Sequence, residues 1–467
     1  MNRMFEFDLT LLENPTSPTF LLKLFWFVFL NGGVLLFIPL ILWGAFRVYM
    51  NIIQERFIRD SDYILISVSI PASAIPSMRA AEHVFTHFAG MHRSPSLIDV
   101  YLDGFIQQRV SLEIVSIGGE TRFIVRFARA FRDLVEAAFY AQYPDAEITE
   151  VEDYAKEARL RFPNSEYDLW GTDLMLAAHP SIPIRTYEDF EDVVQKLYAD
   201  PLKSLLETFA TMQPDEQAWI QIILTPISQD WRKASLEQAK KIAGVKAKQK
   251  ESILSKFFDL LGGLVEGFIN AVGGWEGGGE HETKTELRSL MQFLTPGEQE
   301  QVKAIEKKTE KIGFKTKIRF VYIGKKGVFN KGRGASAVMG YFNQFGGLNS
   351  LKPEPQTKTQ VNYFLRKTRT EWKKNRILKY FKCREAITMT GHGPVMNTAE
   401  IASLYHFPNT EEERVPTNVA RSMSKKGEAP GDLPFDGILP GAAESAATST
   451  GSASPPGAAP SNLPFIN

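Results

Sequence analysis

The sequence SLEIVSIGGETRFIVRF, residues 111–127, contains two runs of alternating apolar residues joined by a Gly-Gly pair. Leu112 and Ile114 alternate before the glycines, and Phe123 and Val125 alternate after them. Alternation of this kind predicts strands with one buried face. A two-residue glycine connection between two such runs predicts a tight β-hairpin.

Further periodic segments flank this hairpin. Upstream, residues 64–70 alternate like a strand, and residues 78–88 carry apolar side chains at the three-to-four spacing of a helix. Downstream, residues 131–139 predict a second amphipathic helix and residues 146–151 a last strand. The order is βαββαβ, so we expect a ferredoxin-like domain over residues 60–154.

A second α/β unit is expected over residues 155–350. A Thr-Pro-Gly-Glu sequence starts one of its helices, with a Thr-x-x-Glu capping pattern and proline at the first position. Strands are predicted at residues 156–162, 169–177, 219–224 and 314–322, and helices at residues 202–212, 295–312 and 335–345.

A helical insertion, residues 228–292, interrupts this second unit. Residues 253–272 within it form an apolar, amphipathic segment that carries Asp259 and Glu266. Two interpretations stay open: the segment covers an apolar surface of the protein, or it lies on a membrane or a partner.

The N-terminal region contains an uncharged apolar run from Leu24 to Phe46. At 1.5 Å per residue a helix of this length crosses a hydrocarbon core of about 30 Å. A cleaved signal peptide is the alternative, but the run is long for one and no small-residue cleavage site follows. We therefore expect a short segment, residues 1–23, and then a transmembrane helix over residues 24–46.

Charge and cysteine content set the expected topology and compartment. Among 467 residues, 54 Lys and Arg balance 54 Asp and Glu, and one cysteine excludes an intramolecular disulfide. Arg47, Arg56 and Arg59 follow the predicted span, whereas Arg3 and Lys23 precede it. The positive-inside rule and the lone thiol predict a single-pass membrane protein with a cytoplasmic C-terminal region.

The two C-terminal segments differ in composition. Residues 351–410 are expected to form a basic helix and a linker segment. Residues 411–467 include a stretch, 440–461, in which 21 of 22 residues are Pro, Gly, Ala, Ser or Thr. Such a composition cannot bury enough apolar surface to offset the entropy of ordering, so a disordered tail is predicted.

The strongest local charge lies between Lys352 and Arg384, where 11 basic residues stand against two acidic ones. Basic groups attract phosphates, and interleaved aromatic rings can stack on exposed bases. A solvated helix face, or one that faces anionic lipid or an acidic partner, is the alternative. The candidate nucleic-acid or anion-binding residues are Arg366, Lys367, Arg369, Trp372, Lys373, Lys374, Arg376 and Lys379.

Motifs for catalysis are weak. His83 and His87 lie one helical turn apart but lack the His-Glu-x-x-His pattern of a zinc protease. Residues 332–336, GRGAS, could hold an anion at a helix start, yet a loop with a helix cap explains them as well. No Gly-x4-Gly-Lys-Ser/Thr motif occurs in the sequence. We expect no catalytic residue, cofactor or metal, and hence no enzyme.

Three stretches resemble the region that precedes the motor in membrane-anchored, conjugation-type (type IV secretion-like) DNA-transfer ATPases of candidate-phylum bacteria. They are DAEITEVEDY at 145–154, MNTAEIASLYHFPN at 396–409 and APGDLPFDG at 429–437. Where that family continues into its ATPase domain, this sequence continues into the predicted tail, so the nucleotide-binding residues have no counterpart.

The resemblance implies a non-enzymatic accessory or platform subunit of a translocation system. Its motor ATPase would be a separate chain and a partner in trans, and a homo-oligomer is also compatible with this role. The alternative is a membrane-tethered protein that binds nucleic acid or anionic lipid through residues 352–384.

Overall fold

The N-terminal unit is built around the predicted hairpin. A computed structural model describes residues 34–71, 77–157, 160–190, 200–243, 294–388 and 391–408. The hairpin strands pair antiparallel through Gly118 and Gly119, whose φ angles of 59° and 89° suit glycine. Along the chain the unit comprises β1 (Tyr63–Ser69), α3 (Met78–Phe88), β2 (Val110–Ile117), β3 (Glu120–Ala128), α5 (Arg132–Gln142) and β4 (Glu147–Val151). Its strands lie in the order β4-β1-β3-β2, so the predicted βαββαβ order is present.

The following unit repeats this arrangement. It comprises β5 (Tyr167–Leu176), α7 (Pro201–Ala210), β6 (Glu216–Pro226), β7 (Gly313–Lys325), α11 (Ala337–Asn343) and β8 (Leu351–Pro353). Its strands lie in the order β6-β7-β5-β8, which is again βαββαβ with the first strand beside the third. The inserted helices α8 (Trp231–Ile242) and α10 (Pro296–Glu310) separate β6 from β7 in sequence. The predicted capping box between Thr295 and Glu298 starts α10.

The two units share one antiparallel sheet. Strands β2 and β6 pair from Val110–Leu224 to Ile117–Gln217, which joins the units edge to edge. With β11 (Val395–Asn397) paired to β7, the sheet has nine strands. The chain therefore has a mixed α/β fold on a continuous antiparallel sheet, and both units belong to one compact body.

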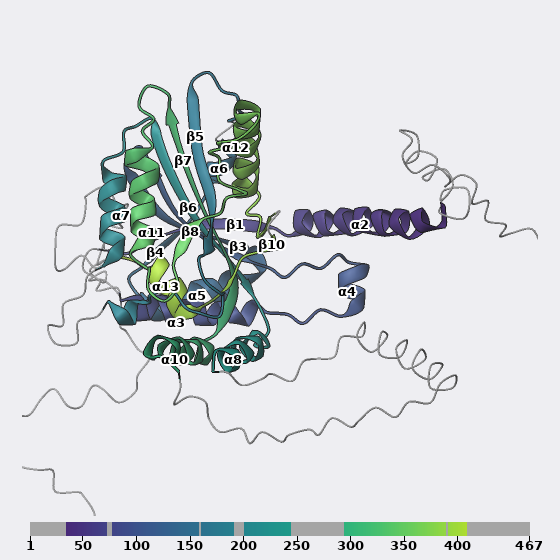
Figure 1. Cartoon of the computed structure of the whole chain (residues 1–467). Coiled ribbons are helices and arrows are strands. Elements are labelled where there is room, and N and C mark those ends of the chain that lie inside the picture. Colours follow the sequence, from purple (N-terminus) through teal and green to yellow (C-terminus); the bar gives the residue numbers. More distant parts are fainter. Residues whose placement is uncertain are drawn as a thin grey trace, which may run out of the picture. The chain divides into compact units, whose positions relative to one another are not determined.

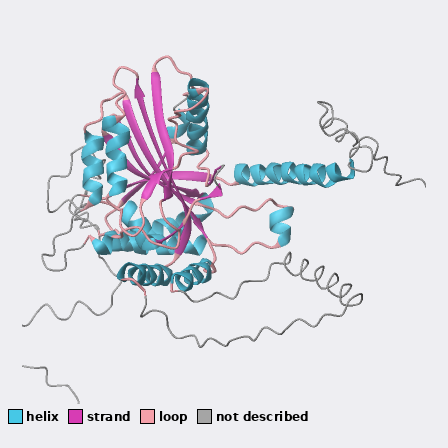
Figure 2. Ribbon diagram, viewed as in Figure 1, coloured by secondary structure: helices cyan, strands magenta, loops and turns pink. Residues whose placement is uncertain are grey.

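Helices cover both faces of this sheet (Figures 1 and 2). Helices α3, α5, α7, α11 and α13 (Thr398–Leu404) contribute to the core on one face. Helix α3 buries the five apolar residues that its spacing predicts: Met78, Ala81, Val84, Phe85 and Phe88. On the other face, α12 (Arg366–Lys382) and α6 (Tyr154–Glu157) pack over a smaller apolar cluster. The remaining short elements are η3 (Ala89–Met91), α4 (Leu97–Tyr101), η4 (Arg129–Phe131), η5 (Tyr187–Asp189), η7 (Gly332–Ser336), β9 (Ile387–Thr388) and β10 (Gly391–His392).

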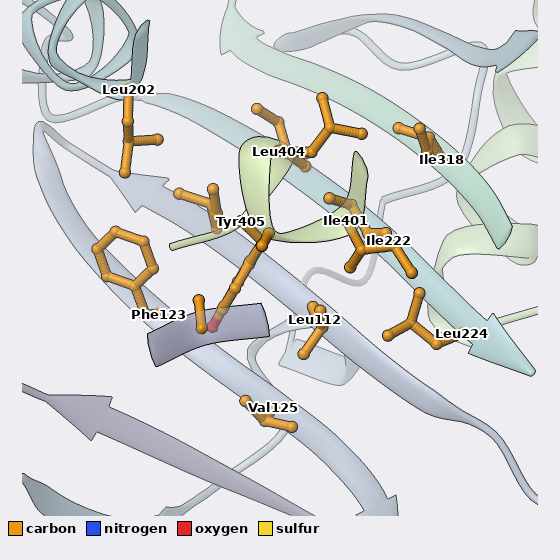
Figure 3. Packing of buried hydrophobic residues seen from close by; sticks show 14 of the residues in the cluster. Leu112, Phe123, Val125, Leu202, Ile222, Leu224, Ile318, Ile401, Leu404 and Tyr405 are labelled. Carbon is orange, nitrogen blue, oxygen red and sulfur yellow. The ribbon is translucent and has the colours of Figure 1, made fainter. Parts of the chain in front are cut away.

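Two predicted segments need correction. Residues 156–162, predicted as a strand, begin with the last residues of α6, and residues 160–166 form no regular element. Part of the predicted linker segment, residues 395–408, belongs to the core instead, because β11 extends the sheet and every residue of α13 is buried. Figure 3 shows Ile401 and Leu404 of α13 among core side chains of the sheet.

The N-terminal helix α2 spans Val34–Asp60. Residues 34–46 of the predicted transmembrane segment form its first part, and residues 24–33 lie outside the described residues. Within the described ranges, none of the helices is both long enough and apolar enough to cross a membrane. The predicted segment 1–23, the amphipathic segment 253–272 and the tail 411–467 also lie outside the described residues.

Candidate functional site

Helix α12 carries all eight candidate residues of the basic segment. It follows Leu365, a residue with a left-handed φ of 57°, and ends before Cys383. Its C-terminal half packs on the sheet through Ile377, Leu378 and Phe381. Its N-terminal half lacks such an apolar stripe, so the two halves present their charges differently.

Two of the candidate lysines are held by contacts with other parts of the protein. Lys373 is buried, and its Nζ donates to the carbonyl oxygens of Pro355 at 3.0 Å and Lys358 at 3.1 Å. Burial lowers the pKa of Lys373. Lys374 forms an ion pair with the Asp168 carboxylate on β5. These two lysines attach α12 to its surroundings and are poorly placed to meet a ligand.

Arg376 and Trp372 contact each other on the outer side of the helix. The guanidinium carbon of Arg376 lies 4.6 Å from the centre of the Trp372 ring, and Arg376 Nε donates to the Tyr380 hydroxyl at 2.8 Å. Such a cation–π contact presents a positive charge and an aromatic ring together. Trp372 remains 54% exposed, so its ring is available for stacking.

The remaining candidate cations are exposed but lie at two places. Arg366, Lys367 and Arg369 lie at the N-terminal end of α12. Lys379 lies ten residues after Arg369, which is about 15 Å along a helix. Lys379 is therefore separate from the other three.

Two aromatic residues outside the predicted set complete this end of the helix. Tyr363 and Phe364 precede α12 and are 57% and 78% exposed. The guanidinium carbon of Arg369 lies 5.1 Å from the centre of the Tyr363 ring. The sequence signal was the Tyr-Phe pair directly before the basic run. We name the following set the α12 N-terminal surface: Tyr363, Phe364, Arg366, Lys367, Arg369 and Trp372.

Beneath the other end of α12 lies a buried polar row that crosses four neighbouring strands. Glu113 on β2 pairs in register with Gln221 on β6, which pairs with Arg319 on β7, which pairs with Asp173 on β5. All four side chains are fully buried. Gln221 Nε2 donates to Glu113 Oε1 at 3.0 Å, and Arg319 donates to Gln221 Oε1 at 3.0 Å and to Asp173 Oδ1 at 2.7 Å.

The polar row holds the C-terminal end of α12. Arg319 donates to the carbonyl oxygens of Tyr380 at 2.7 Å and Glu385 at 3.0 Å. Arg384, which has a left-handed φ of 48°, donates to Glu113 at 3.0 and 3.2 Å and to Asp153 at 2.6 and 2.8 Å. A buried charge is tolerated when it is paired and hydrogen-bonded, as these are.

The ion pair between Glu113 and Arg384 determines the charge state of both groups. Burial acts to raise the pKa of Glu113, but the adjacent Arg384 and further hydrogen bonds outweigh it, so that the pKa lies below its usual value. Burial acts to lower the pKa of Arg384, but Glu113 and Asp153 outweigh it and raise the pKa. Both groups are therefore charged at neutral pH and satisfied within the protein. The arrangement suits a structural clamp rather than acid–base chemistry.

The other motifs are placed without forming a site. His83 and His87 are exposed on α3, and the described part of the chain contains no cluster of three residues able to hold a metal ion. In the GRGAS segment, the backbone N–H groups of residues 332–336 donate to Asn330 or Lys331. Because these donors are already used within the protein, the segment fits a loop and helix start better than an anion site.

Exposed apolar residues lie on α2 and on the segment of α4, and the two helices contact each other. The Tyr49 hydroxyl donates to the Tyr101 carbonyl oxygen at 3.0 Å, and the rings of Phe46 and Tyr101 lie 6.0 Å apart. Leu97, at 76% exposure, is the most exposed of the large apolar residues on these two helices. We name the following set the α2–α4 apolar surface: Trp43, Phe46, Tyr49, Leu97, Ile98, Tyr101 and Leu102.

Comparison with protein families gives a match. A family model described as a domain of unknown function, DUF8128, matches residues 106–419. The match includes the second βαββαβ unit, α12 and α13, and it begins after α2 and α4. No curated protein matches the chain.

Proposed function

We propose that this chain, which belongs to the DUF8128 family of domains of unknown function, is a non-enzymatic, membrane-anchored platform subunit. The observation that carries the proposal is the α2–α4 apolar surface. Isolated apolar residues are common on protein surfaces, but contiguous exposed patches mark contacts with membranes or partners. The resemblance to conjugation-type transfer ATPases supports a translocation system as the setting.

The location of the patch favours a membrane as the surface it contacts. Phe46 is the last residue of the predicted span 24–46, and it touches Tyr101 of the loop that carries α4. Under this proposal the loop lies level with the end of the span, at the depth of the lipid headgroups. Trp and Tyr side chains prefer that region because one end of each ring is apolar and the other polar.

The second half of α2 joins this end of the molecule to the sheet. The rings of Phe57 and Phe105 lie 5.4 Å apart in an edge-on contact. Gln108 Nε2 donates to the Ser61 hydroxyl at 3.0 Å, directly before β1. A helix fixed in this way would hold the nine-stranded sheet at a defined distance from the bilayer, which suits a platform.

Topology and partners complete the proposal. The arginines that follow the predicted span support a cytoplasmic location for the sheet under the positive-inside rule. The proposed partner is a motor ATPase on a separate chain, as the resemblance implies. Copies of this chain could also assemble around such a motor.

Affinity purification of the full chain from detergent-solubilised membranes tests the platform role. We expect an ATPase with a phosphate-binding loop to co-purify and to be absent from an untagged control. Recovery of the chain from solubilised membranes without any such ATPase would contradict a motor in trans. Recovery entirely in the soluble fraction would contradict the anchor.

The α12 N-terminal surface favours a second candidate function, the binding of a polyanion. Three exposed cations stand beside three exposed aromatic rings, and the nearest acidic residue on the helix is Glu371. Positive charge attracts phosphates of nucleic acid or anionic lipid, and exposed rings stack on unpaired bases. Loss of an aromatic ring should weaken binding of single-stranded nucleic acid, whose bases stack on the ring. It should affect binding of anionic lipid less.

A further inference from the structure

A cavity of about 440 Å³ lies on the α12 side of the molecule, away from the α12 N-terminal surface. The ends of β6 and β7, the start of α8 and the β9–β10 hairpin contribute to its walls. Pockets for small molecules commonly occupy 300–1,000 Å³ and combine apolar walls with a few converging polar groups. The lining residues used below are Arg93, Phe105, Arg109, Trp231, Lys315 and His392.

The charged groups of this cavity are of one sign. Among the described residues that line it, none is Asp or Glu. Arg109 donates to the Arg384 carbonyl oxygen at 3.3 Å, a neutral acceptor. In the described part of the chain, neither Arg109 nor Lys315 has a carboxylate within ion-pair distance. Arg93 is paired with Asp99 at 3.1 Å and thus adds less to the positive potential.

The positive potential of the cavity affects the pKa of His392, which lies at its wall. Burial lowers the pKa of His392, and the nearby Lys315 and Arg109 lower it further. Cations that are partly withdrawn from water and lack a counter-charge raise the local concentration of anions. The cavity is therefore electrostatically suited to a negatively charged ligand.

Aromatic side chains form part of the walls. The guanidinium carbon of Arg93 lies 5.2 Å from the centre of the Phe105 ring. The Trp231 ring lies so close to Gly313 that a Cβ there would come within 2.5 Å of it, so glycine is required at that position. The buried indole Nε1 of Trp231 has no acceptor among the described residues.

From these observations we propose that the cavity binds a small organic anion, an aromatic ring that bears a carboxylate or a phosphate. Arg109 and Lys315 would pair with the acidic group, and Phe105 and Trp231 would contact the ring. The proposal does not depend on the membrane anchor or on the platform role. Nothing in the α12 N-terminal surface contributes to this cavity.

Calorimetric titration of the full chain in detergent tests the site with four probes. Benzoate and phenyl phosphate carry a ring and an anionic group, benzyl alcohol carries the ring alone, and inorganic phosphate carries the charge alone. We expect at least one of the two aromatic anions to bind saturably, at least about tenfold more tightly than benzyl alcohol or inorganic phosphate. The preferred aromatic anion then identifies the acidic group that the site accepts.

Variants locate the binding. Lys315→Met keeps the aliphatic stem and removes the charge. We expect it to weaken binding of the preferred aromatic anion by about tenfold or more. Lys326→Met is the matched control, because Lys326 is exposed after the same strand and does not line the cavity. Arg109→Gln provides a second test should Lys315→Met melt at a lower temperature than the parent chain.

Three results would overturn the proposal. They are absence of binding by both aromatic anions at millimolar concentration, equal binding of a neutral or ring-free probe, and equal weakening by Lys315→Met and Lys326→Met.

Discussion

Arg319 and Asp173 face each other across β7 and β5 and form an ion pair of 2.7 Å from which solvent is excluded. The pair lies at one end of the polar row, and Arg319 also connects the sheet to carbonyl groups in and just after the last turn of α12. Because the two strands are about 150 residues apart in sequence, this contact couples distant parts of the chain.

Removal of one partner from this pair should be strongly destabilising. Arg319→Met leaves Asp173 buried, with Lys317 at 3.3 Å, and removes the Arg319 hydrogen bonds to the carbonyl oxygens of Tyr380 and Glu385. We expect a loss of about 3–5 kcal/mol in the free energy of unfolding. Thermal denaturation of the detergent-solubilised chain measures it, and Lys325→Met, at an exposed pair on the same strand, is the control. A loss below about 1 kcal/mol would show that the row is dispensable.

Acid should destabilise the fold through Glu113. Its pKa in the folded protein lies below the ordinary value of 4.5, because Arg384 and hydrogen bonds outweigh the effect of burial. A lowered pKa contributes stability that is fully present above about pH 5 and is lost as the pH falls through the folded-state pKa. Melting temperatures measured from pH 7 to pH 3 should therefore fall less steeply for Glu113→Gln than for the parent chain. Glu120→Gln, at an exposed position on the same hairpin, is the control variant.

The cations of α12 should separate into two functional groups. We expect the triple replacement of Arg366, Lys367 and Arg369 by Ala to weaken binding of anionic polymers. The slope of log affinity against log salt concentration should also become shallower by about two to three, since each phosphate contact contributes about 0.7 to 0.9 to that slope. Lys373→Ala should instead lower the melting temperature, because its Nζ satisfies two carbonyl groups. Salt titrations with fluorescent DNA and anionic vesicles measure the first effect. The interpretation fails if Lys373→Ala alone reproduces the change in slope.

The aromatic rings of the same surface should distinguish nucleic acid from lipid. Phe364→Ala and Trp372→Ala should each reduce affinity for single-stranded DNA more than for duplex, because only unpaired bases can stack on a ring. Phe381→Ala, at a buried position of the same helix, serves as a control for loss of stability. Equal losses for single strands, duplex and anionic vesicles would remove stacking from the account and leave charge alone.

Much of the fold could be predicted because the signals are local. The helical spacing of α3 identified its five buried residues. The Gly-Gly pair marked the turn between β2 and β3, and the capping box at Thr295 marked the start of α10. Prediction failed where local pattern and tertiary context differ. Residues 395–408 have little periodicity over their short elements, and only pairing with β7 and burial against α3 reveal them as core.

The candidate site was predicted in composition but not in geometry. The sequence identified the basic helix, yet it could not show that Lys373 and Lys374 are held by contacts within the protein while Arg366 and Lys367 remain exposed. The polar row was missed because its members come from four strands whose register is set by long-range pairing. Gln221 within the apolar run WIQIIL was the visible signal, since a polar residue in a buried strand needs a partner.

The most direct test of the membrane-anchored platform uses one fluorophore at two alternative positions in the full chain. Leu97→Cys in a Cys383→Ser background places the fluorophore on the α2–α4 apolar surface. The native Cys383, which is exposed at the end of α12, provides the matched control position. After reconstitution into vesicles that contain brominated lipids, we expect strong quenching at position 97 and little at position 383. Equal quenching at the two positions, or failure of the chain to float with the vesicles, would contradict the anchor and the surface that supports it.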